Sequence, residues 1–340
     1  MMIPVRLGAD SYEILLQRGG LLRAGESLNL NRRVLIVTDD GVPDSYAQTV
    51  AAQCKTPLIR AVPGGEGSKS METLTELLSA MLRAGFTRGD CVVAVGGGVV
   101  GDLAGFAAAC YMRGVDFYNI PTTVLSQVDS SIGGKTAVNL DGIKNIVGAF
   151  YQPKAVLIDM DTLDTLPQRQ ISAGLAEAVK MALIFDAALF ARMETEGFTQ
   201  ENAEAIIARS LELKAAVVEA DEKEQGLRKT LNFGHTIGHG IESVSSATLY
   251  HGECVALGML PMCAPDVRAR LVPMLQKLSL PLRCTADQER VYAAMLHDKK
   301  SAEGRLSVIR CPRPGAYEME CVEPAALRDG INMICRGATE

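Results

Sequence analysis

The stretch CVVAVGGGVVGDLAGFAA, residues 91–108, decides the fold class. It begins with an apolar run typical of a buried parallel strand, and the glycine triplet 96–98 follows directly. We expect Gly101 to open the next helix. These glycines satisfy G-x-G-x-x-G, the pattern of a strand, a tight turn and a helix whose N-terminus favours a phosphate. A tight turn with close helix packing needs the same glycines, so the pattern alone does not decide between the two. Asp102 in this turn favours binding of ribose, amide or hydroxyl groups.

Similar strand patterns surround this stretch. Short runs rich in Val and Ile at 34–37, 117–120 and 155–158 predict further buried strands. Residues 69–84 repeat apolar side chains at helical spacing, and Gly85 follows the last of them. Alternation of strands and helices implies a largely parallel sheet with nucleotide chemistry at its carboxyl edge.

The β character fades after residue 165. Helices are predicted at 172–185, 201–220, 233–246, 252–263 and 286–297, with a short hairpin within 305–320. We therefore expect an α/β nucleotide-binding domain over 1–165 and a mainly α-helical domain over 166–340. Two domains also suit a chain of 340 residues.

Composition excludes several classes of protein. A net charge of −6 and the lack of a basic block argue against nucleic-acid binding. The N-terminus is too polar for a signal peptide, and no apolar run reaches the 18 or so residues that span a bilayer. Nine dispersed cysteines without C-x-x-C predict reduced thiols. We expect a cytoplasmic protein that binds neither nucleic acid nor membrane.

Three of the four histidines lie within seventeen residues: His235, His239 and His251, with His297 apart. His235 and His239, in LNFGHTIGHG, are four residues apart and share one helical face, which is how many zinc sites begin. Spacing alone leaves open whether both bind a metal.

Glu177 is the candidate carboxylate ligand. It lies with Lys180 in an otherwise small and apolar helical run, GLAEAVKMALI. An i,i+3 ion pair on a solvated face is the alternative, but the surrounding alanines and leucines favour a buried polar site. No cysteine ligand pattern accompanies the histidines. Two histidines and one carboxylate that leave an open position are typical of a catalytic zinc site.

A second glycine cluster, DSSIGGKTAVN, spans residues 129–139. It is not a P-loop, because Asp129 stands where that motif needs glycine. The density of polar side chains favours a site wall over a solvated loop. Isolated cations suggest a pocket for an anionic substrate, although each one alone suits the surface: Arg113, Lys135, Lys144, Lys180, Lys214, Arg228, Lys299 and Lys300.

Taken in order, several strings resemble the 3-dehydroquinate synthase family of sugar-phosphate cyclases. They are PGGEGSKS, GGGVVGDLAGFAAACYMRGVDF, IPTTVLSQVDSSIGGKTAVNLDGIKNIVGAFYQP, GLAEAVKMALI, LRKTLNFGHTIGHGIE and HGECVALGM. The resemblance implies an NAD-binding domain, a helical domain with zinc or cobalt, and a homodimer. It implies as substrate 3-deoxy-D-arabino-heptulosonate 7-phosphate, which is oxidised transiently by NAD+, loses phosphate, is reduced, opens its ring and closes a carbocycle by aldol addition.

The resemblance also implies site residues, position by position. The metal ligands are Glu177, His235 and His251. The substrate contacts are Arg113, Asp129, Lys135, Asn145, Lys180, Lys214, Arg228, Asn232, His239 and one lysine of the HDKK run, Lys299 or Lys300. The NAD contacts are Asp39, Glu66, Lys69, Gly97, Gly98, Asp102, Thr122, Thr123, Leu125, Asp129, Lys135 and Lys144. One departure is Gly41, where the family commonly has asparagine.

Three other functions compete with this one. A dehydrogenase of the glycerol or iron-dependent alcohol type would release NADH and has no need of so many cations. A non-catalytic nucleotide-binding protein would have lost some metal or lysine positions, yet all are filled. An aminocyclitol-forming cyclase differs in its substrate.

Overall fold

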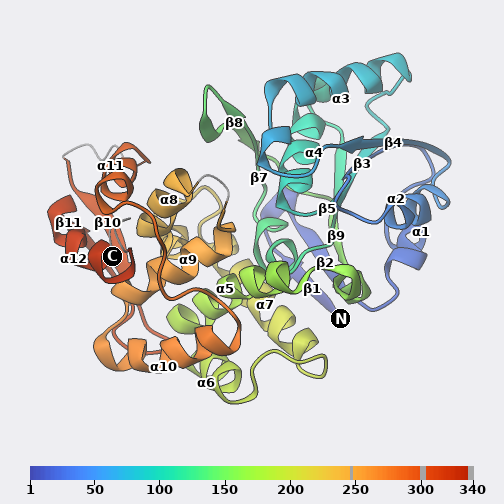
Figure 1. The fold of residues 1–340 in the computed structure, drawn as a ribbon. Helices are drawn as coiled ribbons and strands as arrows, with labels where there is room; N and C mark the ends of the chain where they lie inside the picture. Colours follow the sequence, from blue (N-terminus) through green and yellow to red (C-terminus); the bar gives the residue numbers. More distant parts are fainter. Residues whose placement is uncertain (246–247, 299–303, 336–340) are drawn as a thin grey trace. The chain divides into compact units, whose positions relative to one another are not determined.

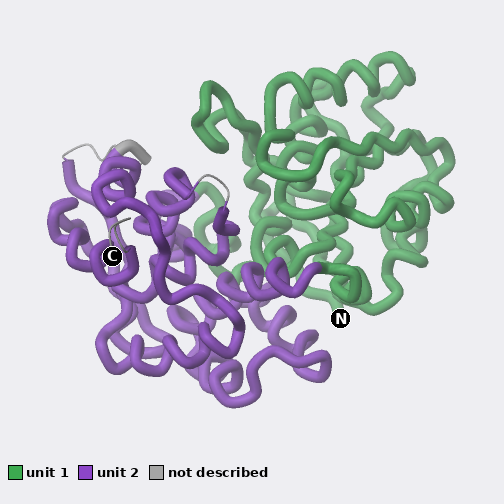
Figure 2. The backbone as a smooth tube through the Cα atoms, in the orientation of Figure 1, with its two compact units in different colours: residues 1–166, 214–223 green, residues 167–213, 224–340 purple. Residues whose placement is uncertain are grey.

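The computed structural model describes residues 1–245, 248–298 and 304–335. The chain divides into two compact units (Figure 2). Unit 1 is Met1–Leu166 with Lys214–Lys223, and unit 2 is Pro167–Leu213 with Glu224–Glu340. The first unit therefore takes in a segment of the second half of the chain that the sequence pattern did not indicate.

Unit 1 is built on a seven-stranded sheet in the order β1-β2-β9-β6-β5-β3-β4 (Figure 1). All neighbouring pairs are parallel except β1 with β2. The strands are β1 (Met2–Val5), β2 (Tyr12–Leu16), β3 (Arg33–Asp39), β4 (Thr56–Val62), β5 (Cys91–Gly96), β6 (Asp116–Pro121) and β9 (Ala155–Ile158). A hairpin of β7 (Lys135–Leu140) and β8 (Ile143–Phe150) forms a separate two-stranded sheet.

Helices cover both faces of the large sheet, because successive side chains of a strand point to opposite faces. Leu35 and Val37 of β3 pack in one core cluster with α3 (Met71–Arg83) and α4 (Gly98–Cys110). Val34 and Ile36 pack in the other, with α2 (Asp44–Ala51) and α1 (Ala24–Ser27). Continuous burial of β3 and β5 on both faces explains why these strands could be recognised as unbroken apolar runs.

The strand order reverses between β3 and β5. The chain runs from β3 to β4 on one side, then returns to β5 and continues to β6 on the other. Neighbouring parallel strands whose connections leave in opposite directions open a crevice at their carboxyl ends, where doubly wound folds bind ligands. Asp39 ends β3 and Gly97 follows β5, so both lie at this point.

Unit 2 is mainly α-helical (Figure 1). Its helices are α5 (Gln168–Phe185), α6 (Ala187–Glu196), the first part of α7 (Ala203–Ala220), α8 (His235–Val244), α9 (His251–Met259), α10 (Pro265–Lys277), α11 (Gln288–Asp298) and α12 (Arg328–Ile334). A hairpin of β10 (Leu306–Arg310) and β11 (Glu318–Val322) lies where the sequence predicts one. The predicted fold class, an α/β part with a largely parallel sheet followed by a mainly helical part, is confirmed.

Several local predictions differ from the structure. Helix α4 begins at Gly98 and not at Gly101, because the bare glycine amides themselves form its first turn. Several elements lacked a clear pattern and were not predicted: β1, β2, β4, β7, β8, α1, α2, α6, α10 and α12. In β4, for example, only Val62 is buried, so the strand has no apolar run to recognise.

Two further features match expectations from composition. None of the nine cysteines, all of which lie in the described residues, forms a disulfide. No helix in the described part of the chain is both long enough and apolar enough to cross a membrane.

Asp186 caps helix α6, and its loss gives a testable change in stability. Its Oδ1 accepts hydrogen bonds from the backbone N–H groups of Ala188 (3.0 Å) and Leu189 (2.9 Å), and its Oδ2 pairs with Arg209 (2.6 Å). Although burial opposes the charged form, these donors hold the pKa of the Asp186 carboxyl below its usual value. Replacing Asp186 with alanine should lower the free energy of unfolding by about 1–2 kcal/mol at pH 7.

The pH dependence of this effect has a defined sign. A carboxyl group with a depressed pKa stabilises the fold above its ordinary pKa of about 4, and this contribution is lost as pH falls through the folded-state value. Urea unfolding of both proteins at pH 7, 5 and 3 should therefore show a difference that shrinks with acid. A difference independent of pH would mean that the carboxylate charge contributes nothing.

Candidate metal and nucleotide sites

Helix α5 carries a buried ion pair at its centre. Glu177 and Lys180 are one turn apart, with 1% and 2% of their side chains exposed, and Lys180 Nζ contacts Glu177 Oε2. Thirteen residues of this helix are buried, including every position from Ser172 to Ile184. A charged pair inside such a helix is costly unless its charges are matched. The burial excludes the solvated-face alternative for this pair.

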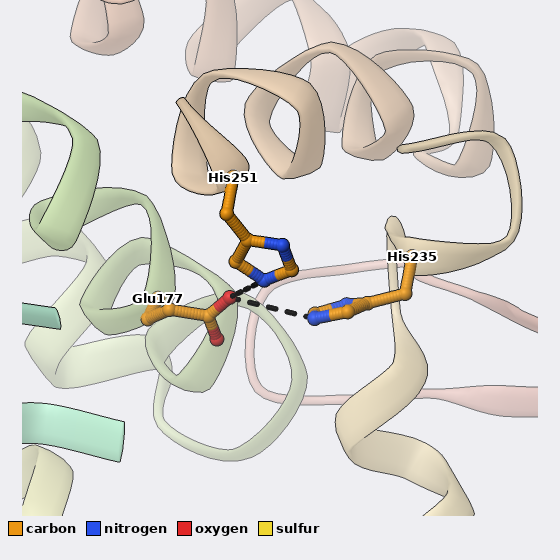
Figure 3. A group of neighbouring side chains, drawn as sticks. All are labelled: Glu177, His235 and His251. Atoms are coloured by element: carbon orange, nitrogen blue, oxygen red, sulfur yellow. Dashed lines mark ion pairs between the residues drawn. The ribbon is translucent and has the colours of Figure 1, made fainter. Parts of the chain in front are cut away.

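Two histidines face the same carboxylate (Figure 3). His235 Nε2 lies 3.5 Å and His251 Nε2 lies 3.6 Å from Glu177 Oε1. His235 is the first residue of α8 and His251 the first of α9, so two helix starts and the middle of α5 deliver the three side chains. They form one of two groups of potential metal ligands among the described residues.

The Nδ1 atom of each histidine, the ring nitrogen that does not face Glu177, already has a hydrogen-bond partner. His235 Nδ1 lies 3.0 Å from the backbone carbonyl oxygen of Phe233, and His251 Nδ1 lies 2.9 Å from Glu242 Oε2. A carbonyl or carboxylate oxygen only accepts, so each Nδ1 carries a proton and donates it. In a neutral imidazole this leaves the lone pair on Nε2, the atom directed at Glu177.

The pKa values of the two histidines are shifted in opposite directions. Burial, the positive charge of Lys180 and the neighbouring histidines hold the pKa of His235 well below its ordinary value. Burial also opposes the charged form of His251, but carboxylates on both sides, Glu177 and Glu242, raise its pKa to about 10. The pKa of Glu177 is lowered to about 2, since Lys180 and His251 outweigh the cost of burying its charge. At neutral pH, Glu177 is therefore an anion and His235 a neutral imidazole, whereas His251 carries a second proton on Nε2 that a bound metal would displace.

The donor set fits a zinc or cobalt ion. Glu177 Oε1 is buried and has no hydrogen-bond donor among the described residues. Ligand atoms on a tetrahedral zinc, each about 2.0–2.1 Å from the ion, lie roughly 3.4 Å apart. The separations of 3.5 and 3.6 Å between Glu177 Oε1 and the two Nε2 atoms match this value closely. Imidazole nitrogen and carboxylate oxygen are also ligand types that zinc accepts.

Glycines bring the three helices close enough for these contacts. A Cβ atom on Gly252 would lie 1.8 Å from the carbonyl oxygen of Ala173 in α5, and one on Gly258 would lie 1.9 Å from that of Gly234. A Cβ atom on Gly238 of α8 would lie 3.0 Å from the carbonyl oxygen of Cys254 in α9. Helix α9 thus packs backbone against backbone on both partners, and only glycine allows this at Gly252 and Gly258.

In unit 1, the predicted NAD contacts gather around a buried lysine. Lys69 is 4% exposed, and its Nζ lies 2.6 Å from Asp102 Oδ2 and also contacts Asn145 Oδ1. Glu66 Oε1 accepts a hydrogen bond from Asn139 Nδ2 at 3.0 Å and lies 3.8 Å from Lys69 Nζ. Burial raises the pKa of Asp102, opposed by Lys69. Asp102, the carboxylate in the glycine turn, is therefore paired with Lys69.

The glycine turn lies beside this cluster. Gly97 is the N-cap of α4, and a Cβ atom there would lie 3.2 Å from Thr123. A Cβ atom on Gly98 would lie 2.9 Å from Ser130 Oγ. Close packing is thus present at this turn in addition to the open backbone that a phosphate would need. Thr122 and Thr123 follow β6, Leu125 precedes the π-helical turn 126–130, and Asp39 accepts the Gly41 N–H at 2.9 Å.

The predicted substrate contacts fall into both units. In unit 1, Lys214 Nζ lies 2.7 Å from Asp129 Oδ1 and donates to the Asp129 carbonyl at 2.6 Å. In unit 2, Arg228 is 2% exposed, and Asn232 Nδ2 donates to Glu224 Oε1 at 2.9 Å. In unit 1, the side chains of Arg113, Lys135 and Lys144 are exposed. Lys299 and Lys300 lie outside the described residues.

Comparison with known proteins shows the family of this chain. The family model for the 3-dehydroquinate synthase N-terminal region matches residues 59–173, and that for the C-terminal region matches residues 174–301. The chain belongs to the 3-dehydroquinate synthase family. It is similar to the 3-dehydroquinate synthases of Pelobacter propionicus (42% identity, covering 91% of this chain and 92% of the relative) and Enterococcus faecalis (43%, covering 98% and 99%).

Solved structures place the family among related cyclases. A 2-deoxy-scyllo-inosose synthase complexed with carbaglucose-6-phosphate, NAD+ and Co2+ is similar at 27% identity, with a TM-score of 0.89 and 97% and 99% of the two chains covered. A 2-epi-5-epi-valiolone synthase from Streptomyces hygroscopicus with NAD+ and Zn2+ bound has 27% identity, a TM-score of 0.87, and coverage of 94% and 96%. A glycerol dehydrogenase from Schizosaccharomyces pombe, 18% identical at a TM-score of 0.64, shares the fold.

For a member of the 3-dehydroquinate synthase family, the structure adds residues that the sequence did not suggest. Glu242 pairs with His251, and Glu224 accepts a hydrogen bond from Asn232. Asn139, which lies in the polar stretch 129–139 already favoured as a site wall, donates to Glu66. Glu242 could have been found: His235, His239 and Glu242 follow the spacing i, i+4, i+7 and so form one stripe on α8. Glu224 lies in an irregular segment, where no periodicity marks a facing side chain.

His239 belongs to a different group from His235. It clusters with Glu242 and His251 and not with Glu177, and its ring lies 5.2 Å from that of His235. Within this family, we expect replacement of His239 by alanine to lower turnover by about 10²-fold, as for loss of a positioned acid–base group. Zinc content by elemental analysis should stay near one per chain. Loss of the metal together with activity would make His239 a ligand.

Proposed function

We propose that this chain is a 3-dehydroquinate synthase, a carbon–oxygen lyase of aromatic amino acid biosynthesis. It converts 3-deoxy-D-arabino-heptulosonate 7-phosphate to 3-dehydroquinate and phosphate. The reaction oxidises the substrate transiently with NAD+, eliminates phosphate, reduces the ketone, opens the ring and closes it again by an intramolecular aldol addition. The observation that carries the proposal is the group in which His235 and His251 Nε2 lie 3.5 and 3.6 Å from the buried Glu177 Oε1, in a chain of this family.

Glu177, His235 and His251 would hold a divalent metal, zinc or cobalt. When bound, such an ion acts as a Lewis acid toward a substrate oxygen. The chain itself prepares the site: Lys180 keeps Glu177 ionised inside α5, and the proton on Nδ1 of each histidine leaves Nε2 as the ligand atom. Gly252 and Gly258 let α9 pack closely on α5 and on the start of α8, and Glu177 is 1% exposed.

The remaining predicted residues would bind the two organic molecules. NAD suits the carboxyl ends of β3 and β5, where Asp39, Gly97 and Gly98 meet and the α4 N-terminus offers free N–H groups. The sugar phosphate needs cations to hold its phosphate and stabilise it as a leaving group. Lys180 and Arg228 of unit 2 are buried cations suited to that role.

Phosphate release tests the function directly. Purified protein is incubated with the heptulosonate phosphate, with and without NAD+, and with and without a chelator. We expect release of phosphate and 3-dehydroquinate only when NAD+ and metal are both present, without net NADH at 340 nm. Net NADH from a polyol would instead identify a dehydrogenase. Turnover of a hexose 6-phosphate in place of the heptulosonate would identify a cyclase similar to 2-deoxy-scyllo-inosose synthase.

The cytoplasm as the location and a homodimer as the assembly complete the proposal. None of the nine cysteines is paired in a disulfide, which suits a reducing compartment. Light scattering coupled to size exclusion should give twice the mass of the chain. A mass equal to one chain, unchanged on adding NAD+ and zinc, would rule out the dimer.

A further inference from the structure

Glu242 stands out among the groups that the proposed reaction does not use. It lies on α8 one turn beyond His239, with 19% of its side chain exposed, and its Oε2 is 2.9 Å from His251 Nδ1. It also belongs to the second group of potential metal ligands, with His239 and His251. Two roles are therefore open to it: direct coordination of a metal, or support of a histidine that coordinates one.

The hydrogen bond to His251 decides between these roles. At 2.9 Å, the Nδ1 and Oε2 atoms share a proton, and a protonated nitrogen has no lone pair for a metal. The other nitrogen of the ring, Nε2, faces Glu177 Oε1 at 3.6 Å. The ring can thus donate a hydrogen bond to Glu242 through Nδ1 and bind the metal through Nε2. Its Nδ1 is then not available to bind a metal in the second group, with His239 and Glu242.

We infer that Glu242 is a positioning residue that holds His251 in the tautomer and orientation needed to bind the metal at Glu177. This inference rests on the proposed metal site. A carboxylate behind a ligand histidine fixes which nitrogen is protonated, orients the ring and makes the ligand nitrogen more basic. Glu242 supplies all three from α8, the helix that also carries His235.

The two histidine ligands differ in their need for such support. His235 has its Nδ1 held by the backbone carbonyl of Phe233, two residues earlier in the chain. The side chain of His251 is more exposed, 31% against 11% for His235. The Nδ1 atom of His251 is thus held by a side chain and that of His235 by the backbone, and this difference makes a single substitution informative.

Metal affinity measures this role without reference to turnover. Metal-free wild type, Glu242→Gln and Glu242→Ala are titrated with zinc against a chromophoric chelator, and with cobalt while its visible absorption is recorded. We expect Glu242→Ala to weaken zinc binding by about 10–100-fold. Glu242→Gln should weaken it less, because the amide oxygen still accepts the Nδ1 proton. The cobalt spectrum of both variants at saturation should keep the shape of the wild-type spectrum.

The control is Glu323→Gln, the same change in an exposed ion pair with Arg305 in the same unit. It should bind zinc like the wild type. Thermal unfolding of the metal-free variants checks that each one is folded. Histidine-selective 15N spectra of the zinc-loaded proteins should show the His251 signals shifted in Glu242→Ala and the His235 signals unchanged.

Each other outcome overturns the inference. Unchanged zinc affinity in Glu242→Ala would leave Glu242 without a role toward the metal. Abolished binding with an altered cobalt spectrum would make it a ligand. A separate variant, Glu177→Gln, tests the underlying site: if it binds zinc like the wild type, the proposed metal site fails, whereas lost binding in Glu177→Gln beside normal binding in Glu242→Ala refutes the inference alone.

Discussion

Replacing His251 with alanine is expected to remove the metal and to lower turnover by about a thousand-fold. The substitution takes away one of the three proposed ligands and leaves Glu177 and His235, whose Oε1 and Nε2 lie 3.5 Å apart. Two ligands do not retain zinc against dialysis when three are needed for a catalytic site. A Lewis-acid metal contributes several kcal/mol to the barrier, and each 1.4 kcal/mol or so is tenfold in rate.

The test combines elemental analysis after dialysis with the phosphate-release assay. His239→Ala is the matched control, because its ring lies beside those of His235 and His251 but outside the group with Glu177. Wild-type zinc content in His251→Ala would refute the ligand assignment. Equal loss of zinc in both variants would mean that the whole cluster is needed for metal binding.

Replacing Gly252 with alanine is expected to have the second largest effect, although no functional group is removed. The added Cβ would lie 1.8 Å from the Ala173 carbonyl oxygen, an overlap with backbone that no side-chain rotation relieves. Helices α9 and α5 must separate, at a cost of about 3 kcal/mol in the free energy of unfolding. Ala173 is one turn before Glu177, and Gly252 follows His251 directly, so the separation should also weaken zinc binding.

Thermal unfolding and zinc titration of the same samples measure both effects. A loss of this size should lower Tm by roughly 10 °C in a unit of 150–250 residues. Gly89→Ala is the control, because its Cβ would meet only Thr87 Oγ1, at 3.8 Å. If Gly252→Ala unfolds and binds zinc like Gly89→Ala, the close approach of α9 to α5 does not position the site.

Periodicity explains which parts of the fold could be predicted. Strands β3, β5, β6 and β9 are largely buried between layers and read as apolar runs, and α3 follows a clear helical repeat that ends at Gly85. Strands β4 and β8 are largely exposed, so their sequences have no strong pattern. The start of α4 at Gly98 could not be predicted from residue types, because glycine is as suitable for a turn as for a first helical turn that packs closely on Ser130.

The candidate site divides in the same way. By itself, the sequence determined the fold class, the scarcity and clustering of histidines, and the presence of Glu177 with Lys180 in an apolar helix. These are properties of composition and of spacing along one helix, which a repeat of 3.6 residues makes readable. The family resemblance then named Glu177, His235 and His251 as ligands from three separate segments.

Only the tertiary structure decided how these segments meet. It directed both Nε2 atoms at one buried carboxylate oxygen, paired His251 with Glu242, and closed α9 on α5 and on the start of α8 through Gly252 and Gly258. Contacts of this kind depend on the distance between backbones that are far apart in the chain. Spacing along the sequence carries no information about that distance, and so LNFGHTIGHG could suggest a metal but could not show which histidine faces Glu177.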